Sequence, residues 1–185
     1  VSPQPSVGAA THRPRKTAFS KPVFMTSPPL HILITDPHLQ GGGQVRYIST
    51  LATGLHALGH RVTVGCRPSS VLVGQTRDCA SPFDRFYFAG GLRLRMWARD
   101  LHTAAGLLRD ARPDIIHVNG SQDHWTMALA NQACGHSIPL LRTRHNTYAV
   151  SANPANRLLN RRLTDFQIVV CETVRQQLAQ HPVFH

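Results

Sequence analysis

The sequence is poor in acidic and in aromatic residues. Of its 185 residues only 9 are Asp or Glu, against 20 Lys or Arg, so the net charge is +11. Such a surplus indicates an anionic partner: a nucleic acid, an anionic membrane surface or a phosphorylated substrate. Aromatic residues make up 6% of the chain, and no stretch interleaves them with basic residues as in surfaces on which nucleic-acid bases stack. We therefore expect no nucleic-acid partner.

Paired cysteines and long apolar runs are also missing. The four cysteines show no C-x-x-C spacing, and Cys66 and Cys171 each end an apolar, strand-like run, where buried free thiols are common. This pattern is typical of a reducing compartment, so we expect a cytoplasmic protein. No apolar run approaches the length needed to span a bilayer. Any membrane contact would therefore be peripheral, on the inner face of the cytoplasmic membrane.

Residues 1–29 lack both acidic residues and hydrophobic periodicity. They are rich in proline, serine and alanine, and their only charges are basic. This composition predicts a disordered, basic, proline-rich leader. A basic and acid-free segment is also typical of an organellar transit peptide, which stays open as an alternative. A third interpretation, which we favour, is that Met25 is the true start, because it lies just ahead of the first expected strand.

The clearest pattern lies between residues 31 and 64. Residues 31–35 form a short apolar run rich in β-branched side chains, which predicts a buried strand. Beyond a glycine-rich loop, apolar residues recur every three or four positions over residues 45–58, which predicts a helix. Gly59 supplies the helix end, and residues 61–64 indicate a second strand. The order strand, loop, helix, strand predicts parallel strands joined by a right-handed crossover.

Gly41, Gly42 and Gly43 occupy the loop between the first strand and its helix. Glycine lets a ligand approach the backbone closely, and a helix N-terminus favours an anion, so a diphosphate is the best candidate ligand. That the glycines only form a tight turn stays open as the alternative. A dinucleotide fingerprint is absent, because Arg46 stands where its last glycine should be, and so is the Gly-Lys-Ser/Thr phosphate loop. The loop indicates a phosphate, but neither an NAD enzyme nor a kinase.

The remaining chain alternates between strand-like and helical patterns. We expect a loop over residues 67–84, a strand at 86–88 and a helix over 92–112 whose apolar face begins with Leu94 and Trp97. The opposite, arginine-rich face of that helix is either solvated or lies on an anionic membrane surface. Further strands are expected at 113–120, 138–141 and 167–171, and further helices at 123–134, 156–165 and 172–180.

Polar side chains follow two of these strands. Asn119 ends the strand at 113–120, and Arg144, His145 and Asn146 follow the strand at 138–141. Ligands of open α/β sheets bind just beyond the carboxyl ends of the strands. Arginine, histidine and asparagine at such a place can bind a phosphate or take part in acid–base chemistry. A purely structural hydrogen-bonding role for the histidine is the alternative, and the two neighbouring arginines favour function.

In their order, these motifs resemble the N-terminal Rossmann-like domain of the family 4 glycosyltransferases, which are retaining enzymes of the GT-B architecture. The resemblance is carried over residues 30–180 by the glycine loop followed by GLHALGHRVTV, and by the segments RPDIIHVNG, IPLLRTRHN and DFQIVVCETVRQQL. It implies an α/β fold with a mostly parallel sheet and helices on both faces. It also implies transfer of a sugar from a nucleotide-sugar donor to a glycan or lipid-linked acceptor in cell-envelope synthesis.

The resemblance further implies roles for single residues. The glycine loop would lie close to the donor diphosphate, and His145 would contact the donor sugar and act in catalysis. Asn119, Arg144 and Asn146 would line the acceptor side. No metal or other cofactor is expected, because basic residues of a second, donor-binding domain would stabilise the leaving diphosphate.

That donor-binding domain has no counterpart in the sequence, whose residues 181–185 resemble the start of the connection to it. We therefore expect a fragment of a longer enzyme, inactive by itself; a separate donor-binding chain is the alternative. The rival hypothesis is a non-catalytic Rossmann-like module that binds an anionic glycan or a partner protein.

Overall fold

The computed structural model describes residues 28–89, 93–135, 138–148 and 150–184. The interpretations of residues 1–27 therefore concern residues outside the described part. Within the described ranges six strands, all parallel, form one sheet in the order β3-β2-β1-β4-β5-β6. They are β1 (His31–Thr35), β2 (Arg61–Gly65), β3 (Ser81–Phe83), β4 (Ile115–Val118), β5 (Leu140–Arg144) and β6 (Phe166–Val169). The expected Rossmann-like α/β fold with a parallel sheet is confirmed.

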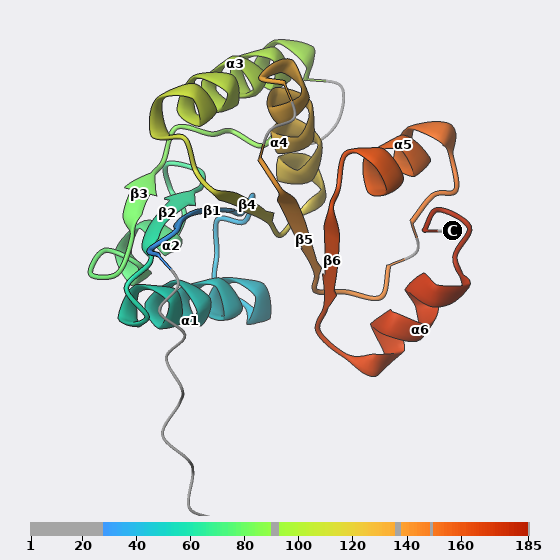
Figure 1. Ribbon diagram of the computed structural model, residues 1–185, viewed down its shortest axis with the longest axis horizontal. Coiled ribbons are helices and arrows are strands. Elements are labelled where there is room, and N and C mark those ends of the chain that lie inside the picture. The colour runs from blue at the N-terminus through green and yellow to red at the C-terminus, as the bar shows by residue number, and fades with distance from the viewer. Residues whose placement is uncertain (1–27, 90–92, 136–137, 149, 185) are drawn as a thin grey trace, which may run out of the picture.

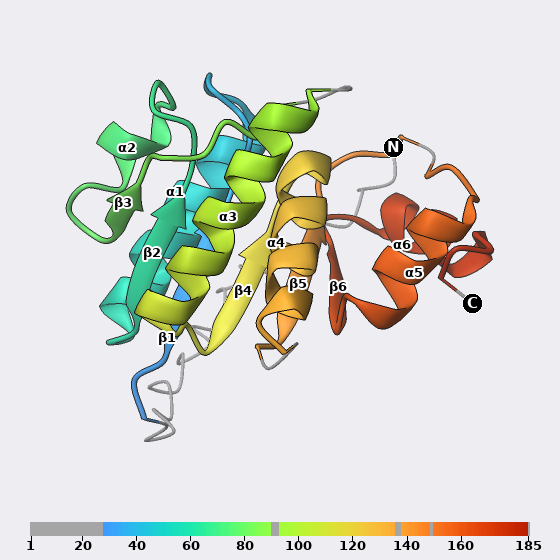
Figure 2. The same cartoon turned by 90° about the horizontal axis from the view of Figure 1, so that it is seen from above.

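Helices cover both faces of the sheet, as expected. They are α1 (Gly43–Ala57), α2 (Leu72–Gln75), α3 (Leu94–Ala111), α4 (Ser121–Ala133), α5 (Pro154–Arg162) and α6 (Glu172–Gln180). Figure 1 shows α1 below the sheet and α3 and α4 above it. Seen from above, α3 and α4 lie next to each other over the strands (Figure 2), and they pack closely together.

The sheet separates two apolar cores. Because successive side chains of a strand point to opposite faces, Ile32 and Ile34 of β1 pack toward α1, whereas Leu33 packs with α3 and α4. All three side chains are buried. Complete burial of such a side chain contributes roughly 1.5–3 kcal/mol. The central strand β1 therefore contributes side chains to both cores, and this packing holds its carboxyl end in place.

The third strand is where the sequence prediction is wrong. It is β3, which lies with α2 in the stretch expected to be a loop, and not Phe86–Phe88. Phe86 and Phe88 are buried core residues whose rings stack at 4.6 Å. The backbone N–H groups of Tyr87 and Phe88 donate to the carboxylate of Asp100, at 2.8 and 2.7 Å. The aromatic run thus reflects burial against α3 and not a place in the sheet.

The predicted apolar face of α3 is also partly wrong. Leu94 and Trp97 are exposed, at 67% and 37%, whereas Asp100 is buried and Ala104 and Leu108 are in the core. The Asp100 carboxylate is drawn inward because it accepts the two N–H groups of the preceding loop. In the described part of the chain, no helix is long and apolar enough to cross a membrane.

The last strands differ slightly from their predictions. The strand expected at residues 138–141 is β5, which starts later and includes Arg142 and Arg144. Beyond β6, Cys171 is exposed and not buried as expected, because it lies past the edge strand of the sheet and caps α6. Cys66 is buried, as expected.

Candidate functional site

The carboxyl ends of β1, β4 and β5 meet at the point where the strand order reverses. Chain connections run from β1 outward to β2 and β3, and then across β1 to β4, β5 and β6. Such a switch point leaves a crevice between the loops after the two central strands, and ligands of open α/β sheets bind there. The structure therefore brings the residues after β1, β4 and β5 to the expected place.

Asn119 and His145 are in direct contact there. The Nε2 atom of His145 lies 2.9 Å from Oδ1 of Asn119. The Asn119 amide nitrogen donates to the carbonyl oxygen of Thr35, at 3.1 Å, which orients the amide so that its oxygen faces the histidine. Because that oxygen can only accept, the His145 proton is on Nε2 and Nδ1 is an acceptor. The sequence predicted both residues, and the structure joins them into one unit.

The imidazole of His145 is half-buried and is held as the neutral form. Burial lowers the pKa of His145, and the charges of Arg142 and His38 lower it further, while Asp36 acts in the opposite direction. The ring of Tyr47, on α1, packs edge-on against it with ring centres 4.9 Å apart. A neutral, oriented imidazole can accept a hydrogen bond from a hydroxyl group of a ligand. Tyr47 could not be predicted as part of this site, because a local pattern shows only its place in the first turns of a helix.

The Asn119 loop is held in place by a buried carboxylate. Asp123, which is fully buried in α4, accepts from the backbone N–H groups of Asn119 and Gly120 and from the hydroxyl of Thr35, each at 2.9 Å. Burial raises the pKa of Asp123 to about 6, against the effect of these hydrogen bonds. A Cβ on Gly120 would clash with Cγ of Pro37. Glycine is therefore required there because the loops after β1 and β4 touch.

The glycine loop is an open surface. Gly41, Gly42 and Gly43 are exposed, and a Cβ added to any of them would meet nothing within 4 Å. Gly42 is the N-cap of α1, and no side chain of the described residues caps that helix end. The packing of this domain thus gives no reason for three glycines in a row, which leaves backbone N–H groups and the positive end of α1 accessible to an anion.

A second acidic group lies between this loop and the strand ends. Asp36, directly after β1, is buried and accepts from the backbone N–H of His38, at 3.1 Å, and from the side chain of Gln44 in α1. The His38 ring forms an ion pair with it at 3.0 Å when protonated. These contacts tie the start of α1 to the end of β1. Asp36 therefore positions the loop that carries the glycines.

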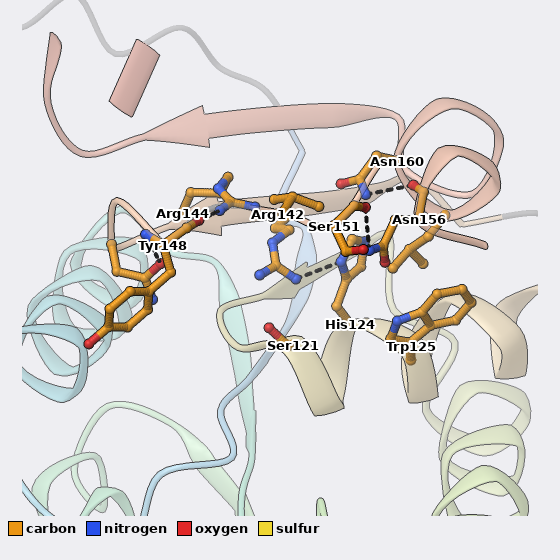
Figure 3. A pocket seen from close by; sticks show the side chains of 12 residues that line it. Ser121, His124, Trp125, Arg142, Arg144, Tyr148, Ser151, Asn156 and Asn160 are labelled. Atoms are coloured by element: carbon orange, nitrogen blue, oxygen red, sulfur yellow. Dashed lines mark hydrogen bonds between the residues drawn. The ribbon is translucent and has the colours of Figure 1, made fainter. Parts of the chain in front are cut away.

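Arg144 and Asn146 line a neighbouring pocket, on the side of α4 and α5. This pocket has a volume of about 290 Å³ and also includes Arg142, His124 and Tyr148. Figure 3 shows Arg142 directed from β5 toward the start of α4, and Arg144 directed toward the loop of Tyr148. Burial lowers the pKa of Arg142 to about 10 and lowers that of Arg144 as well, so both guanidinium groups are charged at neutral pH. The burial of Arg142 was not predictable from the local sequence pattern.

His117, in the middle of β4, predicts a pH dependence of stability. Burial, together with the adjacent His145, lowers the pKa of His117 from 6.5 to about 4, and its Nε2 pairs with the Thr143 hydroxyl at 2.7 Å. Its folded-state pKa lies below the unfolded value, so its contribution is present above pH 6.5 and is lost as the pH falls toward 4. We expect a loss of about 2–3 kcal/mol between pH 7 and pH 4.5.

Urea unfolding of the wild type and of His117→Gln at both pH values measures the contribution of His117 to the free energy of unfolding. Other buried groups also titrate, and Asp100 and Asp123, whose pKa values burial raises, act in the opposite direction. The difference between the two proteins removes their shared contribution. His56→Gln, an exposed histidine of α1, should keep the wild-type pH dependence. If the wild type and His117→Gln lost the same free energy of unfolding between the two pH values, His117 would not be the source of the pH dependence.

A metal site does not stand out in the described residues, which contain no group of three or more His, Cys, Asp or Glu side chains able to hold an ion.

Comparison with known proteins gives one family and one fold. Residues 41–184 match the family described as Glycosyltransferase Family 4. No curated protein matches the chain. Among solved structures, a glycosyltransferase from Rickettsia africae ESF-5 has 20% identity and a TM-score of 0.70, over 84% of this chain and 40% of that one.

Two further structures show how widely the fold is used. HepE of Anabaena, solved in complex with UDP-glucose, has 18% identity and a TM-score of 0.60, over 82% of this chain and 40% of that one. A putative UDP-N-acetylglucosamine 2-epimerase from Listeria monocytogenes has 13% identity and a TM-score of 0.58, over 84% of this chain and 44% of that one. The chain thus spans about two fifths of the length of the structures it matches. At these identities the likeness establishes the fold alone.

Proposed function

The chain belongs to glycosyltransferase family 4, and we propose that it is the acceptor-binding N-terminal domain of a retaining glycosyltransferase. The enzyme would transfer a sugar from a nucleotide-sugar donor to a glycan or lipid-linked acceptor. The proposal rests above all on the pairing of His145 with Asn119 at the carboxyl edge of the sheet.

The geometry of His145 supports contact with the donor sugar. Its Nε2 is occupied by Asn119, and for Nδ1 the described residues supply no hydrogen-bond partner. Because burial keeps the ring neutral, Nδ1 can accept a hydrogen bond from a sugar hydroxyl and so hold the reacting carbon in place. This role is one of binding and orientation, and it needs no metal.

The open glycine loop supports a place for the donor diphosphate. Gly41, Gly42 and Gly43 expose their backbone, and the N-terminus of α1 carries partial positive charge without a capping side chain among the described residues. The phosphates would lie there while basic groups from a second domain complete the site. The solved complex of HepE with UDP-glucose shows that this fold accommodates such a donor in one relative.

Two observations support peripheral attachment to the inner face of the membrane, where lipid-linked acceptors of the cell envelope would be met. The net charge of the chain is +11. Leu94 and Trp97 are exposed at the start of α3, next to the exposed Arg93, Arg95 and Arg99. Apolar and basic side chains on one helix favour an anionic bilayer surface. Co-sedimentation with anionic and with zwitterionic vesicles tests this: equal binding to both, or to neither, would contradict it.

Calorimetry of the full-length gene product with UDP-, GDP- and ADP-sugars tests the proposal. One nucleotide class should bind, and with an acceptor present the product should keep the anomeric configuration of the donor, as seen by NMR. Formation of an isomerised sugar without an acceptor would instead indicate an epimerase, which is the activity in the name of the similar Listeria protein. Binding of an anionic glycan or partner protein, without any nucleotide sugar, would support the rival binding module.

A further inference from the structure

The pocket beside β5 contains two buried arginines whose positive charge the described residues balance only in part. Arg142 and Arg144 are each 8% exposed, yet neither forms an ion pair among the described residues. The Nε atoms of both are buried and have no hydrogen-bond partner in the described part of the chain. Burying an unpaired charge is costly, so such groups are normally matched by an opposite charge.

The hydrogen bonds that the two arginines do make are all to neutral groups. Nη1 of Arg142 donates to the carbonyl oxygen of Gly120, at 2.7 Å, and lies 2.6 Å from Nδ1 of His124. Burial and the two arginines lower the pKa of His124 well below 6.5, so that ring is uncharged. Nη2 of Arg144 donates to the carbonyl oxygen of Tyr148, at 3.0 Å. These contacts fix the positions of both guanidinium groups. The nearby carboxylate of Asp123 offsets part of the Arg142 charge without forming an ion pair with it, whereas for Arg144 burial alone shifts the pKa.

The rest of the pocket suits a small polar ligand. Its polar lining consists of hydroxyl and amide side chains, Ser121, Asn146, Ser151, Asn156 and Asn160, with Trp125 on an apolar wall, and no acidic residue is among them. Its volume of about 290 Å³ is at the lower end of the range for ligand sites. Two fixed guanidinium groups with unused donors match the planar or tetrahedral oxygens of a carboxylate or phosphate.

We infer that this pocket binds an oxyanion of the acceptor, a phosphate or a carboxylate, between Arg142 and Arg144. That the anion belongs to the acceptor rests on the proposed function, whereas the binding of an anion rests on the pocket alone. The acceptor would therefore be an acidic or phosphorylated glycan or glycolipid, in place of a neutral sugar.

Thermal unfolding of the 185-residue chain with glucose 6-phosphate, glucuronate and glucose, at constant ionic strength, tests the inference. An anion at about ten times its Kd should raise the midpoint by roughly 3–5 °C, and glucose should not. A larger shift with glucose 6-phosphate would assign the site to phosphate, and one with glucuronate to carboxylate. Equal shifts with all three, or none, would overturn it.

Variants separate this site from the general basic surface. Arg144→Met should abolish the anion-induced shift and leave the unliganded midpoint unchanged or raised, because an unpaired buried cation is removed. Arg157→Met, an exposed arginine on α5, should keep the full shift. Equal shifts in the two variants would mean that the anion binds elsewhere and would refute the inference.

A second variant gives the answer even if Arg144→Met fails to fold. Ser151→Asp places a carboxylate at an exposed position on the rim of the pocket. It should raise the unliganded midpoint and abolish the anion-induced shift, because the new carboxylate occupies the place of the ligand. An unchanged shift would overturn the inference. These tests use no nucleotide sugar, so their result is independent of donor binding. Anion binding without donor binding would refute only the proposed function. Donor binding without anion binding would refute only the inference.

Discussion

Replacing His145 by alanine is expected to lower kcat/KM for sugar transfer by about 10²–10⁴-fold, the range for a side chain that acts directly at the reacting centre. The imidazole is oriented by Asn119 and by the ring of Tyr47, and burial keeps it neutral. Alanine would remove the oriented acceptor. Steady-state kinetics of the full-length gene product with its donor measures the loss.

The free energy of unfolding should change little in His145→Ala. The ring is half-buried, and a water molecule in the space that it leaves can donate a hydrogen bond to Oδ1 of Asn119. Circular dichroism and urea unfolding check this point. His56→Ala removes an exposed histidine from α1 and serves as the matched control, with unchanged activity. If His145→Ala transferred sugar within threefold of the wild-type rate, His145 would have only a structural, hydrogen-bonding role.

Removal of the Asp123 side chain is expected to cost about 3–5 kcal/mol of the free energy of unfolding. Three buried donors, the N–H groups of Asn119 and Gly120 and the hydroxyl of Thr35, would lose their acceptor at once in Asp123→Ala. The loop that carries Asn119 would also lose its anchor, so the contact with His145 would weaken. Urea denaturation at pH 7 measures the stability, and ligand binding to the folded fraction measures the second effect.

Two variants calibrate the effect of Asp123→Ala. Asp123→Asn keeps the shape and one acceptor oxygen and should lose roughly half as much stability. Asp110→Ala removes an exposed acid from α3 and should lie within about 0.5 kcal/mol of the wild type. A loss in Asp123→Ala no larger than in Asp110→Ala would show that the three donors find other acceptors.

Local patterns predict most of this fold. Apolar runs predict the strands β1, β2, β4 and β6, and helical spacing predicts the helices α1, α4 and α6. The third strand is not predictable in this way. Its sequence, Ser-Pro-Phe, lacks an apolar run, whereas the nearby Phe86 and Phe88 look like a strand but pack into a core. Tertiary burial therefore overrides local propensity in this segment.

The candidate site is predictable only in outline. Asn119 and His145 could be named because each follows a strand, and they meet because β4 and β5 are neighbours and run parallel. Arg142 could be counted among the arginines that favour function, but its burial in a pocket could not be predicted, since an arginine within a strand gives no sign of its surroundings. Its burial depends on the Gly120 carbonyl and on His124, which come from another part of the chain. Contacts of that kind require the assembled fold.

The central place of β1 has a consequence for synthesis. β1 pairs with β2, which follows it closely, and with β4, whose first paired residue, Ile115, comes 83 residues after Ile32. At roughly 5–20 residues per second, a ribosome needs on the order of 4–17 s to make the intervening segment. During that interval one side of an apolar strand lacks its partner. Until translation supplies β4, α1 can cover only the face of β1 that carries Ile32 and Ile34, and the backbone N–H and C=O groups of the edge that faces β4 stay unpaired.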